Sequence, residues 1–459
     1  MSDDGALIDF YPYRGRYRTY RKLDPEPRSR ESILAELREM AQIEDRIGDQ
    51  GRVSGSIYHG DHGHYAFLTE AFGVFGHANV LQRDMYPSAT KLEAEIIAMT
   101  ASLLHHEQAA GVMTSGGTES LINPLLVYRE RGRQRGITEP EVILPVTAHV
   151  ALEKGAHLLG MKPVRAPLRD DWLVDVDWVR RHVTPSTVAL VGSAGSYPYG
   201  LIDPIEELSE IAVEHDLGLH VDGCLGGFLL SFGERLGLQI PVFDFRLPGV
   251  TSISADTHKY GFALKGTSVL LYRTSALRRL QYFNFTDWPG GVYISPGLAG
   301  SRSGGLVAAT WAAMVSLGER GYLEIARAIF ETAAKIRDGV RSIPELEIFG
   351  EPTFVVAFHS PELDIYHVND HLISRGWRLN ALQRPPGLHF CVTRPNTAPG
   401  VAEAFVEDLR AAVEYAKNPA RESARSGALY GLGGTPGGDE TMGALLAAAL
   451  DAMHEVAPE

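Results

Sequence analysis

Four short segments of this chain contain residue types that could together perform chemistry. The first is a run of small and hydroxyl residues, Thr114–Ser120, that leads into the apolar, helix-like run Leu121–Tyr128. Small residues let backbone N–H groups close on an anion, and the first turn of a helix adds a favourable dipole. The segment therefore predicts an anion site with added hydroxyl donors from Ser115 and Thr118. A capped glycine-rich turn without a ligand is the simpler alternative, and it holds for most such strings.

The second segment, Leu219–Phe228, places Asp222 where a buried strand is expected to end. Ligands of open α/β sheets bind beside the carboxyl ends of strands. An ionised carboxylate there needs a cationic partner, because an unpaired buried charge is costly. A protonated pyridine nitrogen is such a partner, whereas an aspartate that caps the next helix is the simpler alternative.

The third segment, Ser254–Gly261, places Lys259 directly after another expected strand and next to His258. Apolar walls and a neighbouring group that can carry positive charge could lower the pKa of this lysine toward nucleophilic competence. The fourth segment, Thr147–Ala156, places His149 between a strand and a helix. Its ring could stack on a flat aromatic cofactor there, or it could simply cap the helix.

These features occur along the chain in the order anion loop, stacking histidine, strand-end aspartate and strand-end lysine. Together they meet the needs of pyridoxal 5'-phosphate (PLP). These needs are a phosphate site, a ring contact, a carboxylate that keeps the pyridine nitrogen protonated, and an amine for a Schiff base. We therefore predict a PLP enzyme that carries its cofactor on Lys259.

The elements that must position these residues lie between about residues 110 and 275, where short apolar runs alternate with helix-like segments. The runs expected to be strands are Glu141–Val146, Thr187–Gly192, Gly218–Asp222, Thr251–Ala255 and Ser268–Tyr272. Such alternation predicts an α/β fold built from βαβ units, with a mainly parallel sheet that is flanked by helices and buried on both faces.

The N-terminal part is expected to be simpler. Residues 1–30 predict an irregular arm, and apolar spacing predicts helices over Glu31–Arg46 and Leu92–His105. The segment Gly51–His64 is polar and glycine-rich, so a loop is expected.

After about residue 310, helices and strands are expected to alternate in a smaller α+β domain. Its elements are Leu323–Ser342, Thr353–Phe358, Ile365–Arg375, Leu388–Thr393 and Ala402–Tyr415. A tail with the glycine-rich stretch Gly431–Gly438 ends in a helix over Glu440–His454. The predicted domains are an N-terminal arm with helices (1–75), a large PLP-binding domain (76–310) and a small C-terminal domain with the tail (311–459).

The composition excludes several classes of function. The 459 residues include 43 Lys and Arg against 57 Asp and Glu, and the net charge of −14 disfavours nucleic acid and anionic membranes as partners. The two cysteines, Cys224 and Cys391, cannot form a disulfide framework or a metal-ligand set. We therefore expect no metal site and a reducing, cytoplasmic location, although export by a signal-independent route would leave no trace in the sequence. No stretch approaches a signal peptide or the ~18 apolar residues of an integral membrane segment.

The chain resembles the sphingosine-1-phosphate lyases, which are relatives of the group II PLP-dependent decarboxylases of fold type I. The resemblance covers about residues 30 to 435. The matching strings are Gly51–Gly55, Thr114–Ser120, His220–Phe228, Gly249–Gly261, Thr286–Tyr293, Ala299–Gly305 and Gly376–Gln383. The strings around the lysine match the wider PLP group, whereas those at Thr286 and Gly376 point to the lyases. The membrane-spanning N-terminal helix of the eukaryotic members is absent, as in the soluble bacterial type.

The resemblance implies the large domain of fold type I, with its seven-stranded sheet, and a role for each matching residue. Lys259 forms the Schiff base, Asp222 pairs with the pyridine nitrogen, and His149 stacks on the ring. The cofactor phosphate is held by Ser115, Gly116, Gly117, Thr118 and His258. Gly304 and Gly305 reach the same phosphate from a second subunit, which implies a homodimer with shared active sites.

The same resemblance places Tyr58, Asn79, Tyr197 and Lys265 on the substrate side of the site. Gln82 belongs to this set, at a position where the family usually has His in an Asn-x-Leu-His string. Here the string reads Asn79-Val-Leu-Gln, so an amide replaces the imidazole on the side of the site that binds the substrate phosphate or hydroxyl.

The implied reaction is a retro-aldol cleavage of the C2–C3 bond of a sphingoid base phosphate, giving a fatty aldehyde and phosphoethanolamine. Lys259 and Tyr197 are candidates for the proton transfers, and Asp222 stabilises the cationic ring. An amino-acid decarboxylase is the alternative, but it needs a site for an α-carboxylate, whereas Tyr58, His258 and Lys265 offer donors suited to a phosphate. A catalytically silent PLP-fold binding protein is a third alternative, which the presence of Lys259 and Asp222 disfavours.

Overall fold

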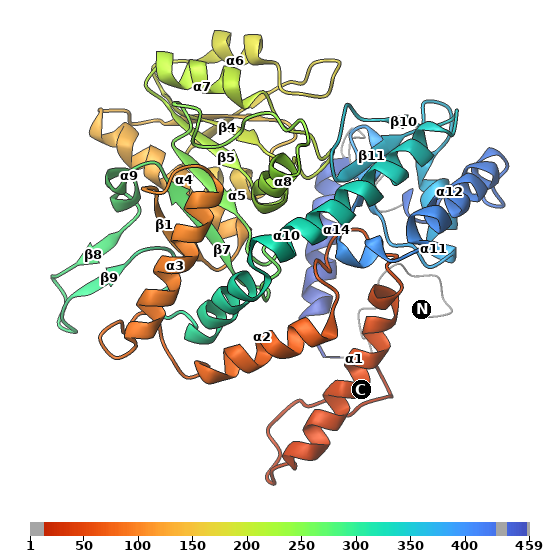
Figure 1. The fold of residues 1–459 in the computed structure, drawn as a ribbon, viewed down its shortest axis with the longest axis horizontal. Coiled ribbons are helices and arrows are strands. Elements are labelled where there is room, and N and C mark those ends of the chain that lie inside the picture. The colour runs from red at the N-terminus through yellow and green to blue at the C-terminus, as the bar shows by residue number, and fades with distance from the viewer. Residues whose placement is uncertain (1–12, 428–437, 457–459) are drawn as a thin grey trace.

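The computed structural model describes residues 13–427 and 438–456, and its largest element is a sheet with helices on both faces (Figure 1). The strands of this sheet are β1 (Ala110–Thr114), β2 (Glu141–Pro145), β3 (Lys162–Ala166), β4 (Thr187–Ser193), β5 (Gly218–Asp222), β6 (Ser252–Ala255) and β7 (Ser268–Tyr272). Their order is β1-β7-β6-β5-β4-β2-β3, and only β7 runs antiparallel to its neighbours, β1 and β6. The predicted mainly parallel, seven-stranded sheet is confirmed.

The sheet is buried on both faces, because several of its strands, β2 and β7 among them, send alternate residues into two different apolar clusters. In β4, Leu190 joins one cluster, and Ala189 and Val191 join the other. Among the helices that contribute to the first cluster are α3 (Pro87–Leu103), α6 (Val176–His182), α7 (Ile205–Glu214) and α8 (Gly226–Arg235). Those on the second side are α4 (Gly117–Gln134), α5 (Ala151–Leu159) and the short α9 (Ser275–Arg279).

The N-terminal part forms two further helices, α1 (Arg30–Asp49) and α2 (His62–Val74). The loop predicted over Gly51–His64 ends three residues early. The Asp61 side chain accepts a hydrogen bond from the His64 N–H at 3.1 Å and caps α2 there. Helix α2, which was not predicted, then packs along the first part of the long helix α10 (Figure 1).

The C-terminal part is the predicted smaller α+β unit. Its four-stranded antiparallel sheet has the order β10-β11-β13-β12. Its elements are α10 (Gly304–Arg341), β10 (Glu347–Ile348), β11 (Val355–His359), α11 (Ile365–Ser374), β12 (Asn380–Gln383), β13 (Pro386–Cys391), the 3-10 turn η1 (Arg394–Thr397), α12 (Val401–Lys417) and α14 (Gly438–Met453). Of the glycine-rich stretch predicted at 431–438, all but Gly438 lies outside the described residues.

Helix α10 starts before the predicted domain boundary at residue 310 and crosses it. It kinks at Gly318, whose φ of 56° and ψ of 179° only glycine adopts readily. A two-stranded hairpin, β8 (Phe283–Phe285) and β9 (Tyr293–Ser295), precedes α10 and was not predicted. None of the helices within the described ranges is long and apolar enough to cross a membrane.

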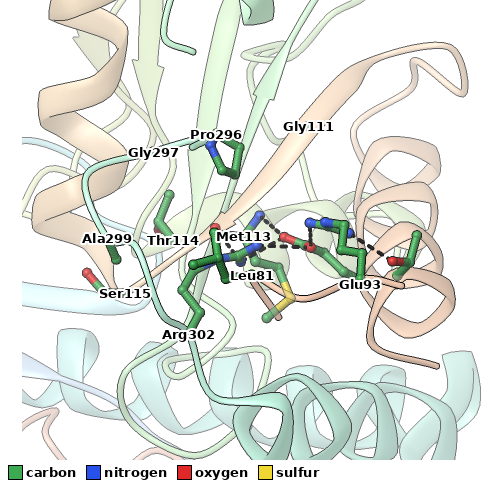
Figure 2. Close-up of polar contacts among 12 residues, drawn as sticks. Leu81, Glu93, Gly111, Met113, Thr114, Ser115, Pro296, Gly297, Ala299 and Arg302 are labelled. Carbon is green, nitrogen blue, oxygen red and sulfur yellow. Dashed lines mark hydrogen bonds and ion pairs between the residues drawn. The ribbon is translucent and has the colours of Figure 1, made fainter. Parts of the chain in front are cut away.

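Glu93 of α3 ties the strand that precedes the anion loop to the start of α10 (Figure 2). Its buried carboxylate accepts hydrogen bonds from Arg302 at 2.8 Å, Arg83 at 2.5 Å and the Met113 N–H at 3.2 Å. Burial alone would raise the pKa of Glu93, but the bonds and charges of Arg302 and Arg83 outweigh it and hold the pKa below its ordinary value.

We expect Glu93→Gln to lower the free energy of unfolding by about 3 kcal/mol at pH 7, because Arg302 is then left buried without its counter-charge. Since the folded pKa of Glu93 is depressed, the ion pair stabilises fully above the ordinary glutamate pKa of about 4.3 and is lost as the pH falls below it. Urea unfolding at pH 7 and in acid tests both points. The exposed Glu414→Gln is the control, and an equal stability loss in the two variants would contradict the prediction.

Candidate active site

The carboxyl ends of the parallel strands bring the predicted catalytic side chains together. Asp222 ends β5, Lys259 follows β6, His149 follows β2 and Tyr197 follows β4. Since these strands run in the same direction, all four side chains lie at one edge of the sheet.

A cavity of about 230 Å³ opens at this edge. Five of the predicted site residues line it: Tyr58, His149, Tyr197, Lys259 and Lys265. The remaining lining comes largely from the loop before α2 and from the C-terminal sheet, namely Ser54, Gly55, Ser56, Leu225, Val355, Asn380, His389 and Cys391.

Lys259 forms an ion pair that the sequence interpretation did not include. Its Nζ lies 2.8 Å from Oδ2 of Asp256, which is fully buried. Burial alone would lower the pKa of Lys259, but the Asp256 carboxylate outweighs it and raises the pKa well above the ordinary value. The expected lowering of the Lys259 pKa was therefore wrong for the cofactor-free chain, because the nearest charged group is an anion and not His258.

Asp222 is buried and has one carboxylate oxygen available for a cation. Its Oδ1 accepts from the Cys224 N–H at 3.0 Å and lies 3.5 Å from the Ser254 hydroxyl. Among the residues that the structure describes, none bonds to Oδ2. This geometry fits the predicted pairing with a protonated pyridine nitrogen.

His149 bonds to the start of a helix and also lines the cavity. Its Nδ1 accepts from the Ala151 N–H at 3.1 Å, which caps α5 and leaves the proton on Nε2. Its ring also faces the cavity and meets Tyr197 edge-on, with ring centroids 6.1 Å apart. Capping fixes the orientation of the ring that the prediction assigns to cofactor stacking.

The anion loop has the shape that a phosphate requires. Gly116 has φ 142° and ψ 179°, which only glycine tolerates, and α4 begins at Gly117 with its first N–H groups exposed to a ligand. The N–H and the hydroxyl of Ser115, however, both donate to Glu119, at 2.8 and 2.7 Å. The predicted contribution of Ser115 would therefore require these bonds to rearrange, whereas Thr118 is exposed in the first turn.

His258 lies against this loop. Its Nδ1 donates to the Thr267 carbonyl at 2.5 Å, and its Cε1 lies 3.8 Å from the position that a Cβ on Gly116 would take. Burial lowers the pKa of His258, although Asp256 partly offsets the effect. The ring therefore lies beside the anion loop, and its predicted contact with the cofactor phosphate stays a prediction.

Tyr58 and Lys265 form a pair on the substrate side of the cavity. The Lys265 ammonium lies 4.6 Å from the centre of the Tyr58 ring. Burial raises the pKa of the Tyr58 phenol, which stays a hydrogen-bond donor, and desolvation together with the charge of Lys259 lowers the pKa of Lys265 to about 8.

The other four predicted residues lie outside the cavity lining but beside one another. Asn79 pairs with Ser303 in a β-bridge, and the Gln82 N–H donates to the Asn79 carbonyl at 3.0 Å. A Cβ on Gly304 would lie 2.7 Å from Ala78, and one on Gly305 would lie 2.8 Å from Phe72. The segment that leads into α10 passes Ser115 (Figure 2). There the Leu298 N–H donates a hydrogen bond to Glu119.

Three residues of the cavity wall were missed by the sequence interpretation and form one network. Asn380 Nδ2 lies 2.8 Å from His389 Nε2 and 2.9 Å from the Ser54 hydroxyl, and His389 Nδ1 donates to the Pro198 carbonyl. Burial lowers the pKa of His389 to about 4, so this histidine is neutral. Its ring meets Tyr197 edge-on at 5.0 Å. Ser54 and Asn380 lie within strings that matched the family, which is the signal that could have found them.

These residues fit PLP. PLP has a phosphate, a ring nitrogen and an aldehyde. The glycine cradle at a helix N-terminus with a neutral histidine beside it suits the phosphate, the buried Asp222 carboxylate suits the ring nitrogen, and the lysine that lines the cavity suits the aldehyde. Elsewhere, His105, Glu234 and Asp244 are spaced closely enough to hold a metal ion. Arg246 donates to both of those carboxylates, so a guanidinium already supplies the positive charge there.

Comparison with known proteins agrees with this site. The pyridoxal-dependent decarboxylase conserved domain matches residues 57–360. The sphingosine-1-phosphate lyase of Oryza sativa subsp. japonica is 46% identical over 84% of this chain and 73% of its own length. The structure of the sphingosine-1-phosphate lyase of Burkholderia pseudomallei K96243 is 52% identical, with a TM-score of 0.91 over 97% of this chain and 99% of that one.

The fold alone is shared more widely. The glutamate decarboxylase of Lactobacillus brevis CGMCC 1306 is 20% identical, with a TM-score of 0.74 over 90% of this chain and 99% of that one. The predicted fold class and the predicted cofactor are both confirmed, and the chain belongs to the sphingosine-1-phosphate lyases of the pyridoxal-dependent decarboxylase family.

Proposed function

We propose that this chain cleaves the C2–C3 bond of a phosphorylated sphingoid base and releases a fatty aldehyde and phosphoethanolamine. The observation that carries the proposal is the 52% identity to the Burkholderia pseudomallei lyase, which extends over 97% of the chain.

The residues of the cavity suit this cleavage. When bound, PLP supplies an electron sink for the pair released as the C2–C3 bond breaks. Lys259 would hold the cofactor, and its place in the cavity makes it a candidate proton carrier. Asp222 keeps the pyridine nitrogen protonated. Tyr197, held edge-on between His149 and His389, is the second candidate to move the proton of the C3 hydroxyl.

The substrate side favours a phosphate over an α-carboxylate. The described residues that line the cavity include two lysines, Lys259 and Lys265, and no arginine. Arginine is the usual partner for bidentate recognition of a carboxylate, whereas lysine serves phosphates as a point charge. Lys265 and Tyr58 would therefore bind the substrate phosphate, and this disfavours the decarboxylase alternative.

Incubation with sphingosine-1-phosphate beside a panel of aromatic and acidic amino acids tests the proposal. Fatty aldehyde without CO2 is the expected result. Release of CO2 from an amino acid without any aldehyde would refute it. An absorbance scan of the purified protein that shows no cofactor band in the visible range would instead support a silent binding protein.

We also propose a homodimer with shared active sites. Two apolar surfaces of the single chain support it: the exposed face of α1 with Ile33, Leu34 and Leu37, and the projecting β8–β9 hairpin with Phe283 and Trp288 (Figure 1). A lone helix or a two-stranded hairpin is only marginally stable without a packed apolar face, so a second subunit would cover these surfaces.

We also propose a cytoplasmic location, which the free thiols of Cys224 and Cys391 support.

Active-site complementation tests the sharing of sites. We expect Lys259→Ala and Asn79→Ala to be inactive alone. If Asn79 serves the site of the partner subunit, random mixing of the two variants gives one intact site in half of the dimers, or about a quarter of wild-type activity. No recovery in mixed dimers that are verified by mass would contradict shared sites.

A further inference from the structure

The Asp256–Lys259 pair has a consequence for how the cofactor is attached, and it holds whatever the substrate is. Asp256 is 1% exposed, and among the residues that the structure describes no group makes a hydrogen bond of good geometry to either of its carboxylate oxygens. Lys259 Nζ at 2.8 Å is its close ionic partner, and His258 Nε2 follows at 3.8 Å. A buried carboxylate with so few hydrogen-bond donors depends on that one ammonium to balance its charge.

The same carboxylate lies beneath the phosphate loop. A Cβ on Gly117 would lie 2.7 Å from Asp256 Oδ2 and 3.1 Å from Oδ1. Asp256 therefore contacts the first residue of α4, where the cofactor phosphate is expected. The pair holds the Lys259 amine between this loop and the cavity.

The neighbouring groups do not replace Asp256 as a counter-charge. The titratable groups that face the pair are Tyr58, Cys224, His258, Lys265 and Cys391. Burial raises the pKa values of both thiols and of the phenol, so all three stay neutral near pH 7. Lys265 adds positive charge, and the His258 pKa is lowered.

We propose that Asp256 is a positioning residue that controls cofactor attachment by holding Lys259 as a buried ammonium until the cofactor arrives. Attachment needs the lone pair of the neutral amine, so the ammonium first gives up one proton to water. Nζ then forms a C=N bond with the aldehyde carbon of PLP, and the aldehyde oxygen leaves as water with the two remaining amine hydrogens. Asp256 thus makes the free lysine slow to react with aldehydes in general, including an aldehyde product.

The test is the rate at which the cofactor-free protein acquires the visible band of attached PLP, followed at saturating cofactor from pH 6 to 10. At each pH this rate is divided by the rate at which free Nα-acetyl-lysine reacts with PLP. The ratio removes the effect that the ionisation of PLP has on both rates. For Asp256→Asn we expect attachment at pH 7.5 to be at least about tenfold faster, because the lysine pKa falls by a unit or more. Asp203→Asn, a buried aspartate that bonds to the Ser193 N–H and not to Lys259, should leave the rate unchanged.

An Asp256→Asn rate equal to or below that of the wild type, in a folded protein, would overturn the proposal. If the variant does not fold, the pH dependence of the wild-type attachment rate tests the proposal instead. A rate ratio that stays level up to pH 10 supports a lysine held protonated, whereas a ratio that falls above pH 8 shows a lysine that is already neutral and refutes the role of Asp256.

Discussion

Replacing Lys259 by alanine should reduce turnover to below about one ten-thousandth of wild type, because the variant lacks the amine that is predicted to carry the cofactor. The fold should largely survive, because the Lys259 side chain contributes one ion pair and Asp256 can take up a proton in its absence. Activity assays with sphingosine-1-phosphate and far-UV circular dichroism measure the two effects. In cofactor-loaded wild type, borohydride reduction and peptide mapping should find the modification at position 259.

Lys259→Arg separates the charge of the side chain from its nucleophilicity. Arginine keeps a cation beside Asp256 but cannot attach the cofactor, so this variant should be equally inactive and at least as stable as Lys259→Ala. The exposed Lys335→Ala serves as the control with full activity. Multiple turnovers by either variant at position 259 would refute the assignment of this lysine.

The central sheet could be predicted because its strands are buried on both faces. All five strands expected from apolar runs are present, since such runs leave no alternative when helices cover both sides. Strands β1 and β3, which lie at the two edges of the sheet, were missed, and β3 exposes Lys162 and Arg165. The first half of α10 was missed because glycines at its start disfavour a helix, and the structure places these glycines against Ala78 and Phe72.

The site was predictable where a strand end places a side chain, and not where distant segments meet. Lys259, Asp222 and His149 each follow a parallel strand, so their common edge follows from the topology. Asn380 and His389 face the cavity because β12 pairs with β13 in a register that sets these two residues opposite each other. No local pattern specifies that register. The sign of the Lys259 pKa shift was missed for a related reason, because it depends on which way the Asp256 side chain turns.

The second large effect is expected at Asp222. Asp222→Ala should lower kcat by about a thousandfold while the cofactor stays attached to Lys259. The physical reason is electrostatic: a carboxylate beside the pyridine nitrogen favours its protonated form, and without it the ring accepts electrons less readily as the C2–C3 bond breaks. The neighbouring Cys224 N–H and Ser254 hydroxyl cannot take over, because both are donors that now lose their acceptor.

A cofactor with a permanent positive charge distinguishes this electrostatic role from a structural one. Loading Asp222→Ala with PLP methylated at the pyridine nitrogen supplies the cation that the carboxylate would otherwise maintain, and the alanine leaves room for the methyl group. We expect this combination to recover at least about tenfold in kcat, whereas the same cofactor should not improve the wild type. If activity stays at the level of the variant with ordinary PLP, Asp222 acts by holding the end of β5 in place and not through the charge of the ring.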